Sequence, residues 1–449
     1  MRASSDRLNI AVVGTGIAGM SAAWLLSTRH DVTVYEQATR LGGHTNTIEV
    51  TAAGGATLPV DMGFIVFNPE TYPNLVALFD HLGVATQPSD MSLGLSLRDG
   101  ALEYAGGDLG GLFAQRTNLL RPRFWKMLRD LVRFYREASR DARQAESGAR
   151  TLGEYLAAGG YGEAFMRDHL LPMAAAIWST PAERMLDHPA AAFLRFCDNH
   201  GLLRLRGRPQ WRTVTGGSRR YVAPLTAPYA DRIRLGCPVR SVRRSARRVE
   251  VVDGSGVRHG YDHVVIAAHA DQALAMLADP SPAETALLES IGYGRNDAVM
   301  HRDAALMPRR RAAWSSWNYI GAEGNDGDGA LCATYWMNRL QRLPDPAPVL
   351  VTLNAPRAPR PETVIHRETY EHPQFDAAAM RAQRDLWSLQ GVRRTWYCGA
   401  WFGAGFHEDG LQAGLAVAEA LGGVRRPWTV AAPSGRLYQP QPRQWDLAA

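Results

Sequence analysis

The first 36 residues alternate between a strand, a glycine-rich turn, a helix and a second strand. An apolar run at residues 8–13 leads directly into the sequence GTGIAG at residues 14–19, and an apolar pattern of helical spacing follows. A second apolar run, residues 32–35, ends at Glu36. In such a turn the first glycine permits the reversal, the second lets the backbone approach a pyrophosphate, and the third lets the helix pack on the strand. The order predicts a parallel α/β unit that holds an adenine dinucleotide.

The start of the helix and the acid after the second strand are the polar parts of this unit. The helix N-terminus offers free N–H groups and the positive end of its dipole to the phosphates. Glu36 is placed to accept hydrogen bonds from the adenosine ribose hydroxyls. The contacts predicted for this unit are Gly14, Gly16, Ile17, Ala18, Gly19, Glu36 and Gln37.

A second glycine pair lies just beyond the acid, in the sequence RLGGH. An arginine and two glycines there suit a longer ligand whose diphosphate is contacted from both sides, which favours a flavin over a nicotinamide dinucleotide. A glycine-rich surface turn is the plain alternative. At residues 60–63 an acid and a glycine could bring the backbone close to an isoalloxazine ring. The predicted contacts here are Arg40, Leu41, Gly42, Gly43, His44, Gly63 and Phe64.

Length and composition indicate a folded protein of two intertwined domains. The chain has 449 residues, of which 46% are hydrophobic and 21% charged, an ordinary globular balance. No apolar run approaches the roughly 18–20 residues that span a bilayer. The first strand begins near residue 8 and leaves no room for a signal peptide, so we expect a cytoplasmic protein.

Cysteine and histidine spacing argues against metal and disulfide chemistry. The four cysteines are far apart and form no CxxC pair, so buried free thiols are expected. The histidines show no ligand spacing either. We therefore predict no metal site.

Positive charge comes almost entirely from arginine, since Lys126 is the only lysine and the formal net charge is +6. A proteome-wide codon bias explains arginine clusters better than nucleic-acid binding does, so no nucleic-acid partner is predicted. The helix expected at residues 124–143 has an apolar face and an arginine-rich face. It reads either as an ordinary core helix or as a membrane-surface helix that admits a lipid, with acidic headgroups as the partner.

The pattern along the chain predicts a mixed α/β fold with a discontinuous Rossmann-like domain. Residues 69–200 look largely helical, and strand character returns at 213–271, at 295–356 and at 395–399. A helix is expected at 410–421, and an irregular tail after it. We assign residues 1–80, 208–290 and 392–425 to the dinucleotide domain, residues 81–207 and 291–391 to an interleaved substrate domain of helices and an antiparallel sheet, and residues 426–449 to the tail.

The order of the sequence blocks carries a family resemblance. After GTGIAG and RLGGHTNT come VDMGF, TGGS at 215–218, CPV at 237–239, DHVVIAA at 262–268, and YCGAWFGAGFHEDGLQAGLAVAEAL at 397–421. This order resembles the flavin-containing amine oxidase-like superfamily, which includes monoamine oxidases, protoporphyrinogen oxidases and phytoene desaturases. The blocks SWNY and HEDGL are more specific. They resemble the predicted NAD/FAD-binding proteins associated with cyclopropane-fatty-acyl-phospholipid synthases.

The resemblance implies noncovalent FAD and a set of further contacts. Val239 would present its backbone to adenine, and Gly399 with the loop 405–411 would surround the ribityl chain and pyrimidine ring. The helix that begins near residue 410 would aim N–H groups at the pyrimidine carbonyl. The additional contacts implied are Val239, Gly399, Gly405, Phe406, Asp409, Gly410 and Leu411.

Two departures from the family pattern bear on chemistry. Many relatives carry an acid after the glycine of the last block, where this chain has Ala400, so Glu408 or Asp409 would have to compensate. Amine oxidases place a lysine beside the flavin N5, which Lys126 cannot supply from the helical region. His301, on the strand expected to reach N5, is the candidate substitute as a proton acceptor, with a structural histidine as the alternative.

The motifs predict an FAD-dependent oxidoreductase, and the subfamily resemblance implies an apolar, lipid or fatty-acyl substrate. The aromatic residues at 314–319, 335–336 and 401–402 suit either an apolar substrate wall or plain core packing. Two alternatives stay open. One is a true amine oxidase for a small-molecule amine, and the other is a non-redox FAD-containing accessory protein of a lipid methyltransferase.

Overall fold

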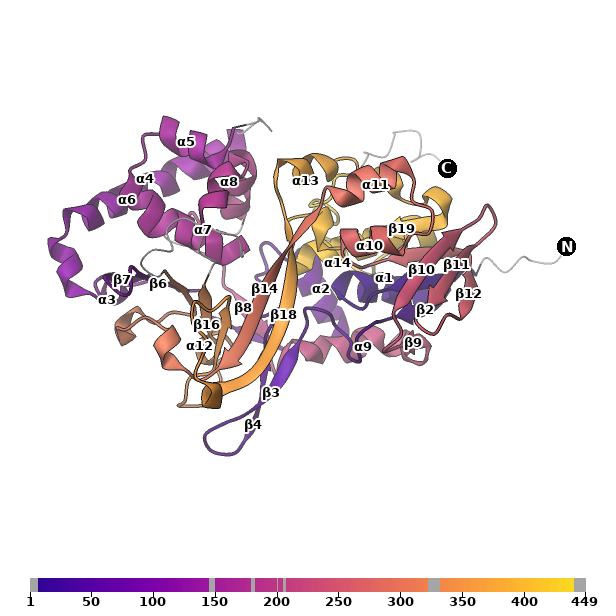
Figure 1. Ribbon diagram of the computed structural model, residues 1–449, viewed down its shortest axis with the longest axis horizontal. Helices are drawn as coiled ribbons and strands as arrows, with labels where there is room; N and C mark the ends of the chain where they lie inside the picture. Colours follow the sequence, from indigo (N-terminus) through magenta and orange to yellow (C-terminus); the bar gives the residue numbers. More distant parts are fainter. Residues whose placement is uncertain are drawn as a thin grey trace.

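The computed structural model describes residues 7–144, 150–178, 182–199, 201–204, 207–321 and 332–439. Figure 1 shows a parallel sheet with its helices at one end of the molecule and a lobe of helices at the other. Two long strands, β14 (Gly292–His301) and β18 (Val364–Gln374), run between them. The predicted mixed α/β fold with a parallel sheet is confirmed.

The parallel sheet has the strand order β19-β13-β1-β2-β9 and draws on distant parts of the chain. Every described pairing in it is parallel. Parallel strands covered on both faces are expected to be continuous apolar runs, and residues 10–13 are all buried. The strands are β1 (Asn9–Val13), β2 (Asp31–Tyr35), β9 (Ile233–Arg234), β13 (His263–Ile266) and β19 (Thr395–Tyr397).

Two helices from opposite ends of the chain pack together beside this sheet. They are α1 (Ile17–Ser27), in which all but the last residue is buried, and α14 (His407–Gly422). A Cβ added to Gly414 would lie 2.2 Å from the Ala18 carbonyl oxygen, so the two backbones are in direct contact. A helix that is apolar on all sides is buried on all sides, and α1 follows that rule.

A seven-stranded sheet forms the second layer, with the order β18-β14-β17-β16-β15-β6-β7. It is antiparallel except for the parallel pair β15–β6. The strands β5 (Thr86–Pro88), β6 (Leu93–Leu97) and β7 (Leu102–Gly106) interrupt the stretch predicted to be helical, because residues 98–100 make a turn between two apolar runs of strand length. The remaining strands are β15 (Trp317–Ile320), β16 (Ala333–Trp336) and β17 (Leu350–Leu353).

The helical lobe is a contiguous stretch of the chain with its own apolar core. Its longest helix, α4 (Pro122–Gln144), buries Phe124, Met127, Phe134 and Tyr135. The apolar stripe of this helix therefore packs inward, as an ordinary core helix does. The shorter helices are α3 (Leu109–Leu112), α5 (Leu152–Ala158), α6 (Glu163–Phe165), α7 (Leu171–Trp178) and α8 (Ala190–Asn199).

Smaller elements complete the dinucleotide end. A hairpin of β3 (Thr47–Thr51) and β4 (Thr57–Asp61) follows the second glycine pair. A three-stranded sheet is made by β10 (Val239–Arg244), β11 (Val249–Asp253) and β12 (Arg258–Tyr261). Helices α2 (Pro73–Leu82) and α10 (Ala270–Met276) also belong to this end. In the described residues no helix is long and apolar enough to cross a membrane.

The segment after residue 425 is irregular but attached. The Arg426 guanidinium donates to Asn74 Oδ1 at 2.9 Å and pairs with Glu419 at 2.8 Å. The Trp428 ring stacks on Trp24 of α1 with centroids 5.8 Å apart. The described part of the predicted tail is thus fastened to helices α1 and α2, and residues 440–449 lie outside the described residues.

Candidate active site

One large cavity of about 760 Å³ connects the parallel sheet, the seven-stranded sheet and the helical lobe. Its wall begins at Gly14 and Glu36 in the dinucleotide unit and extends to Ile177 and Phe196 in the helical lobe. It opens at the carboxyl ends of β1, β2 and β13, where ligands bind in open α/β sheets.

The three glycines of the first turn do three different jobs. Gly14 has a φ of +102°, and a Cβ there would lie 2.6 Å from the Ala267 carbonyl oxygen. A Cβ on Gly19 would lie 2.0 Å from the Gly14 oxygen, so that glycine allows helix α1 to pack on the turn. A Cβ on Gly16 would meet no protein atom within 4 Å. Gly16 therefore faces open cavity, where a pyrophosphate can approach the backbone.

Glu36 is held at the end of β2 by the same turn. Its carboxylate accepts from the Thr15 N–H at 2.9 Å, the Thr15 hydroxyl at 2.5 Å and the Ala38 N–H at 2.8 Å. These bonds fix the carboxylate where the adenosine ribose is expected. The other polar or backbone groups of this end come from Gln37, Val239, Arg240 and Gln272.

Of the second glycine pair, Gly43 lies on the cavity wall and Gly42 lies behind it. Gly42 donates its N–H to the Thr15 carbonyl at 3.1 Å, and the Arg40 guanidinium donates to the Gly43 carbonyl at 2.8 Å. A Cβ on Gly43 would lie 3.1 Å from the Gly16 Cα. Gly43 and His44 line the cavity, whereas Arg40, Leu41 and Gly42 hold the loop from behind.

Four histidines line the middle of the cavity: His44, His269, His372 and His407. The Nε2 atom of His44 is buried without a hydrogen-bond partner, and the Nδ1 atom of His269 lies 3.6 Å from the Glu371 carboxylate. Burial lowers the pKa of His44 well below its usual value, lowers that of His372 to about 4 and lowers that of His407 to about 3. Burial also lowers the pKa of His269. These rings are neutral at pH 7.

The proton position on His372 follows from its partner. The Asn296 amide nitrogen donates to the Gly294 carbonyl at 3.1 Å, and its oxygen accepts from Asn354 at 2.8 Å. That amide nitrogen lies 3.1 Å from His372 Nδ1, which must therefore accept. The neutral ring then carries its proton on Nε2, as a hydrogen-bond donor.

His407 stands at the N-terminus of α14 with its ring stacked on Phe64, the centroids being 3.8 Å apart and the planes 7° apart. Its Nε2 atom lies 2.7 Å from the Tyr221 hydroxyl oxygen. The N-terminus of α14 thus opens on the cavity through Phe406 and His407. This places a positive helix-dipole end at the wall.

The far end of the cavity is apolar. The Trp317 and Tyr335 rings meet edge to face at 4.5 Å, and Phe196 stacks on Phe406 at 5.0 Å. The carboxylates on the wall, Glu36 and Glu371, lie at the other side, at the end of β2 and beside His269. The described side chains of the far end are Met91, Ile177, Phe196, Leu202, Trp317, Tyr335 and Leu353.

Asp61 lies behind the wall and organises it. Its carboxylate accepts from Ser218 N at 2.9 Å, from the Thr47 hydroxyl at 2.6 Å and from Gln341 Nε2 at 3.0 Å. Burial raises the pKa of Asp61 to about 6. The next residues, Met62 and Gly63, line the cavity.

The prediction that His301 reaches the flavin needs correction. His301 is fully buried outside the cavity wall. Its Nδ1 accepts from the Asp303 N–H at 3.0 Å, and its Nε2 lies 2.7 Å from the Thr352 hydroxyl. Burial lowers its pKa to about 4. Both ring nitrogens are satisfied, so His301 is a structural histidine.

The proposed substitutes for the acid missing at Ala400 are also corrected. Glu408 accepts from the Asn74 and Leu75 N–H groups at 3.1 and 2.9 Å, and so caps helix α2. Asp409 accepts from the Phe406 N–H at 2.8 Å and pairs with Arg436 at 3.2 Å. Neither carboxylate lines the cavity, and Ala400 itself does.

The other predicted contacts divide into wall and support. Gly19, Gly410 and Leu411 are packing residues behind the wall. Of the predicted aromatic residues Trp317, Tyr335 and Trp401 line the cavity, whereas Trp314 and Trp336 pack on each other at 5.4 Å. The predicted residues on the wall are Gly14, Gly16, Ile17, Ala18, Glu36, Gln37, Gly43, His44, Gly63, Phe64, Val239, Gly399, Gly405 and Phe406.

The sequence did not predict three of the four histidines on the cavity wall, nor any of the wall residues that β18 contributes. Tyr370 and His372 lie two apart on that strand, which brings both to one face. The Tyr370 hydroxyl accepts from Asn46 at 3.0 Å, and its ring lies 4.9 Å from that of His44. Rings at the alternate positions 370 and 372, together with the β-branched residues at 363–365 and 369, are the signal that could have revealed this strand.

Thiol and metal chemistry have no visible place at this site. Within the described ranges no group of three His, Cys, Asp or Glu side chains could hold a metal ion. All four cysteines are free thiols, and Cys237 alone lines the cavity, next to Val239 at the dinucleotide end. No cysteine of the chain stands at the flavin end.

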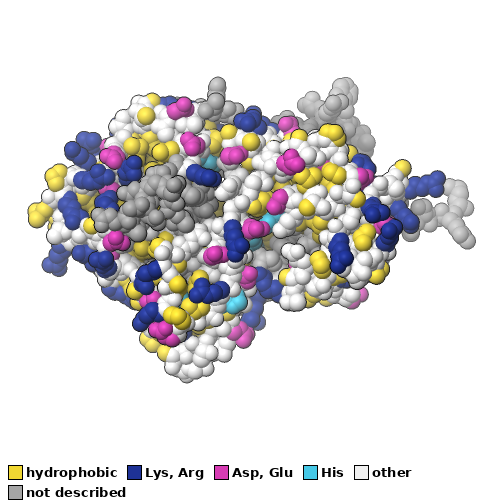
Figure 2. Space-filling model, in the orientation of Figure 1, with side chains coloured by type: hydrophobic (Ala, Val, Ile, Leu, Met, Phe, Trp, Pro, Cys, Tyr) yellow, Lys and Arg dark blue, Asp and Glu magenta, His cyan; other side chains and the backbone are white. Residues whose placement is uncertain are grey.

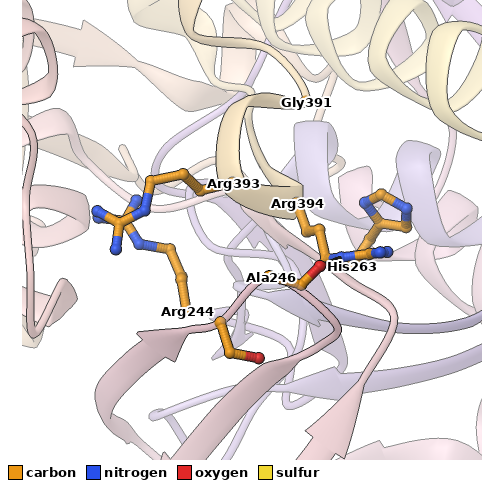
Figure 3. Close-up of a pocket in the computed structure, with 7 residues that line it drawn as sticks. Arg244, Ala246, His263, Gly391, Arg393 and Arg394 are labelled. Carbon is orange, nitrogen blue, oxygen red and sulfur yellow. Dashed lines mark hydrogen bonds between the residues drawn. The ribbon is translucent and has the colours of Figure 1, made fainter.

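A second, open hollow of about 560 Å³ lies on the outer surface between β10 and the start of β19. Figure 3 shows the guanidinium groups of Arg244 and Arg393 side by side and that of Arg394 directed toward His263. Arg244 pairs with Asp279 at 3.0 Å, Arg393 pairs with the same carboxylate, and Arg394 donates to the Ala246 carbonyl at 3.2 Å. These arginines connect the three-stranded sheet of β10 with the segment before β19, and each of the three bonds a protein group.

The parallel sheet, the glycine turn and the cavity at its carboxyl edge define a dinucleotide-binding oxidoreductase. The family model for flavin containing amine oxidoreductases matches residues 17–303, and the chain belongs to that family. It is an FAD-dependent enzyme. No curated protein matches the sequence.

Solved structures show the same fold at low sequence identity. A putrescine oxidase triple mutant shares 16% identity with a TM-score of 0.67, over 92% of this chain and 98% of that one. Cyclohexylamine oxidase from Brevibacterium oxydans shares 18% at 0.66, over 92% and 99%. A fatty acid isomerase from P. acnes shares 16% at 0.65, over 93% and 99%.

The residues present fit FAD. Open space in front of Gly16, the free N-terminus of α1 and the held carboxylate of Glu36 suit the adenosine diphosphate half. The unpartnered Nε2 of His44 is a buried polar atom on the wall, and such atoms normally have partners. A polar ligand in the cavity would supply one.

Proposed function

We propose that the enzyme oxidises an apolar, lipid or fatty-acyl substrate by hydride transfer to noncovalent FAD. The observation that carries this proposal is the far end of the cavity. Its described side chains are aromatic or aliphatic, and the carboxylates of the wall stand at the opposite side. A long hydrocarbon gains free energy from burial against such a wall, whereas a charged substrate would lose its hydration there with no carboxylate of the far end to pair with it.

FAD, when bound, supplies the acceptor for a hydride. The chain supplies orientation and a dry site. Neutral histidines on the wall add no positive charge next to an apolar substrate, and the Nε2–H of His372 can donate a hydrogen bond. The N-terminus of α14 favours negative charge at the adjoining wall.

The test is the visible spectrum of the FAD-loaded protein during anaerobic mixing with candidate substrates. Bacterial phospholipids and free fatty acids form one panel, and mono- and polyamines form the other. Bleaching of the flavin by the first panel alone is expected. Bleaching by amines alone would replace the lipid proposal with amine oxidation.

A true amine oxidase is the second candidate, and the Trp317–Tyr335 pair favours it. Two ring faces at the end of a flavin cavity can hold an amine by cation–π attraction or by packing. The structural neighbours include a putrescine oxidase and a cyclohexylamine oxidase. Against it stands Lys126, the only lysine, which is exposed on α4 and absent from the wall. Peroxide release from the amine panel tests this candidate.

A lipid methyltransferase remains a proposed partner, supported by the resemblance to proteins associated with cyclopropane synthases. Co-purification of such an enzyme with the tagged protein tests the association. Flavin turnover in the isolated protein would exclude a purely accessory role, because an accessory protein needs no substrate-driven reduction of its flavin.

A further inference from the structure

Exposed apolar side chains gather at one place on the helical lobe. Among the described residues eight large hydrophobic side chains are exposed, and four of them fall between residues 109 and 125. Leu109 is 75% exposed, Leu119 47%, Leu120 85% and Trp125 49%. Single exposed apolar residues are ordinary, but a concentrated group marks an interaction site.

These four side chains belong to one ordered surface. The Trp125 indole donates to the Leu119 carbonyl at 2.9 Å, and its ring lies 5.9 Å from that of Phe113. The Phe113 N–H donates to the Leu109 carbonyl at 3.1 Å, one helical turn away. The Asp108 carboxylate caps α3 by accepting from the Gly111 N–H at 2.7 Å. The apolar group is therefore presented by fixed backbone.

The surface is surrounded by positive charge. Residues 107–129 contain five basic residues and a single acid, Asp108, which is the α3 cap. Arg116 and Lys126 are exposed on either side of Leu119 and Leu120. In Figure 2 the far edge of the helical lobe, at the left, shows dark blue side chains interspersed with yellow ones.

The position differs from the one that the sequence pattern of α4 indicated. The apolar stripe of α4 is committed to the core of the lobe through Met127, Phe134 and Ala138. The exposed apolar residues come instead from α3, from the turn at Arg116–Leu120 and from the first residues of α4. The surface is thus the tip of the lobe, not the arginine-rich face of the helix.

We propose that this tip surface (Leu109, Leu119, Leu120 and Trp125 with Arg116 and Lys126) docks on an anionic phospholipid bilayer. Leucine and tryptophan side chains enter the interface between headgroups and acyl chains, where indole rings concentrate. Arginine and lysine beside them bind the lipid phosphates. Charge complementarity favours a bilayer, because the exposed cations Arg116 and Lys126 flank the exposed leucines in the sequence, and an anionic surface can meet both together with the apolar side chains.

The docking proposal is independent of the redox chemistry. The helical lobe that carries the tip surface also gives Ile177, Phe196 and Leu202 to the apolar end of the cavity. With the lipid substrate proposed above, a bilayer-bound tip would also hold this lobe next to the membrane that contains the substrate.

The experiment is co-sedimentation of the FAD-loaded protein with vesicles of phosphatidylcholine alone or mixed with phosphatidylglycerol. Binding to the mixed vesicles, weakened by salt, is expected. Leu120→Asp should lower that binding at least about tenfold, since it places a charge at the depth of the headgroups. Val257→Asp is the matched control: Val257 is 51% exposed in the β11–β12 turn of the opposite end and should bind like the parent. The visible flavin spectrum checks that each variant is folded.

Brominated lipid adds a second measurement. Such vesicles should quench tryptophan fluorescence in the parent, and Trp125→Phe should remove most of that quenching. The proposal is overturned if the mixed vesicles do not bind the protein, or if L120D and V257D lose binding equally. It is also overturned if L120D abolishes a dimer in sedimentation velocity while leaving vesicle binding intact, because a second copy of the chain would then cover the surface.

Discussion

The two ends of the active-site cavity are built in opposite ways. The dinucleotide end is made largely of backbone and a fixed carboxylate, from residues 14–18, 36–37 and 43, which are close in sequence. The far end is made of seven apolar side chains from seven places between Met91 and Leu353. The dinucleotide end suits a cofactor that stays the same, because its contacts come from backbone shape. The far end can accept a different substrate when its side chains are exchanged. The difference between the two ends shows how one cofactor site can be combined with different substrates.

The largest expected effects come from substituting two glycines of the first turn, one needed for packing (Gly19) and one facing the cavity (Gly16). Gly19→Ala forces a Cβ to 2.0 Å from a carbonyl oxygen and should abolish folded, flavin-loaded protein. Gly16→Ala adds a methyl group in open space, so the apoprotein should fold while FAD affinity falls about 100-fold, or about 2.7 kcal/mol. FAD titration and thermal unfolding of the apoprotein separate the two. Gly54→Ala, also in open space but on the β3–β4 turn, is the control.

The next effect concerns the neutral histidines between the two ends. His372 has a pKa of about 4 in the folded protein against roughly 6.5 when unfolded, so the unfolded chain binds more protons between these values. Stability of the apoprotein should therefore fall as the pH drops below about 6.5, by on the order of 3 kcal/mol from this group once the pH is near 4. Urea unfolding across this range measures the slope. His372→Gln should have a shallower slope than the parent; an equal slope would contradict the assignment.

A smaller effect is expected at His301, because it lies outside both ends. His301→Ala leaves the Asp303 N–H without its partner and takes from the Thr352 hydroxyl one of its two partners, the other being the Thr334 hydroxyl at 2.8 Å. The loss should cost about 1–3 kcal/mol of stability. FAD affinity and the rate of anaerobic flavin reduction should stay within about twofold of the parent. Loss of the reduction rate without loss of stability would restore a catalytic role.

The smallest expected effects come from substituting one side chain at each end of the cavity. Trp317→Ala enlarges the far end and should change kcat/KM for the true substrate roughly tenfold while leaving FAD affinity unchanged. Gln272→Ala, at the dinucleotide end, should lower FAD affinity and leave kcat/KM of the FAD-loaded enzyme unchanged. Flavin titration and steady-state kinetics on both variants test this. If each variant changed both quantities alike, the two ends would not be independent.

The dinucleotide end could be predicted from sequence because its signals are local. Glycines at fixed offsets, a strand before them and an acid after them specify the turn, its helix and the place of Glu36 on the cavity wall within 36 residues. The far end could not be predicted, since its residues are brought together only by the packing of two sheets and the helical lobe. No spacing in the sequence links Ile177 with Trp317.

The error at His301 has a geometric cause. Side chains alternate along a strand, so residues separated by an odd number point to opposite faces. On β14 Asn296 contacts His372 of the cavity wall, and His301 is five residues further on. The strand was expected correctly at this place, but its register was not visible in the sequence.

The parallel sheet also sets the order in which the protein can mature during translation. Strand β1 is translated about 250 residues before its neighbour β13 and nearly 400 residues before β19. The helical lobe, by contrast, is contiguous and can assemble while synthesis continues. The sheet that carries the nucleotide motif is therefore complete only when β19 has been made, after the whole of the helical lobe.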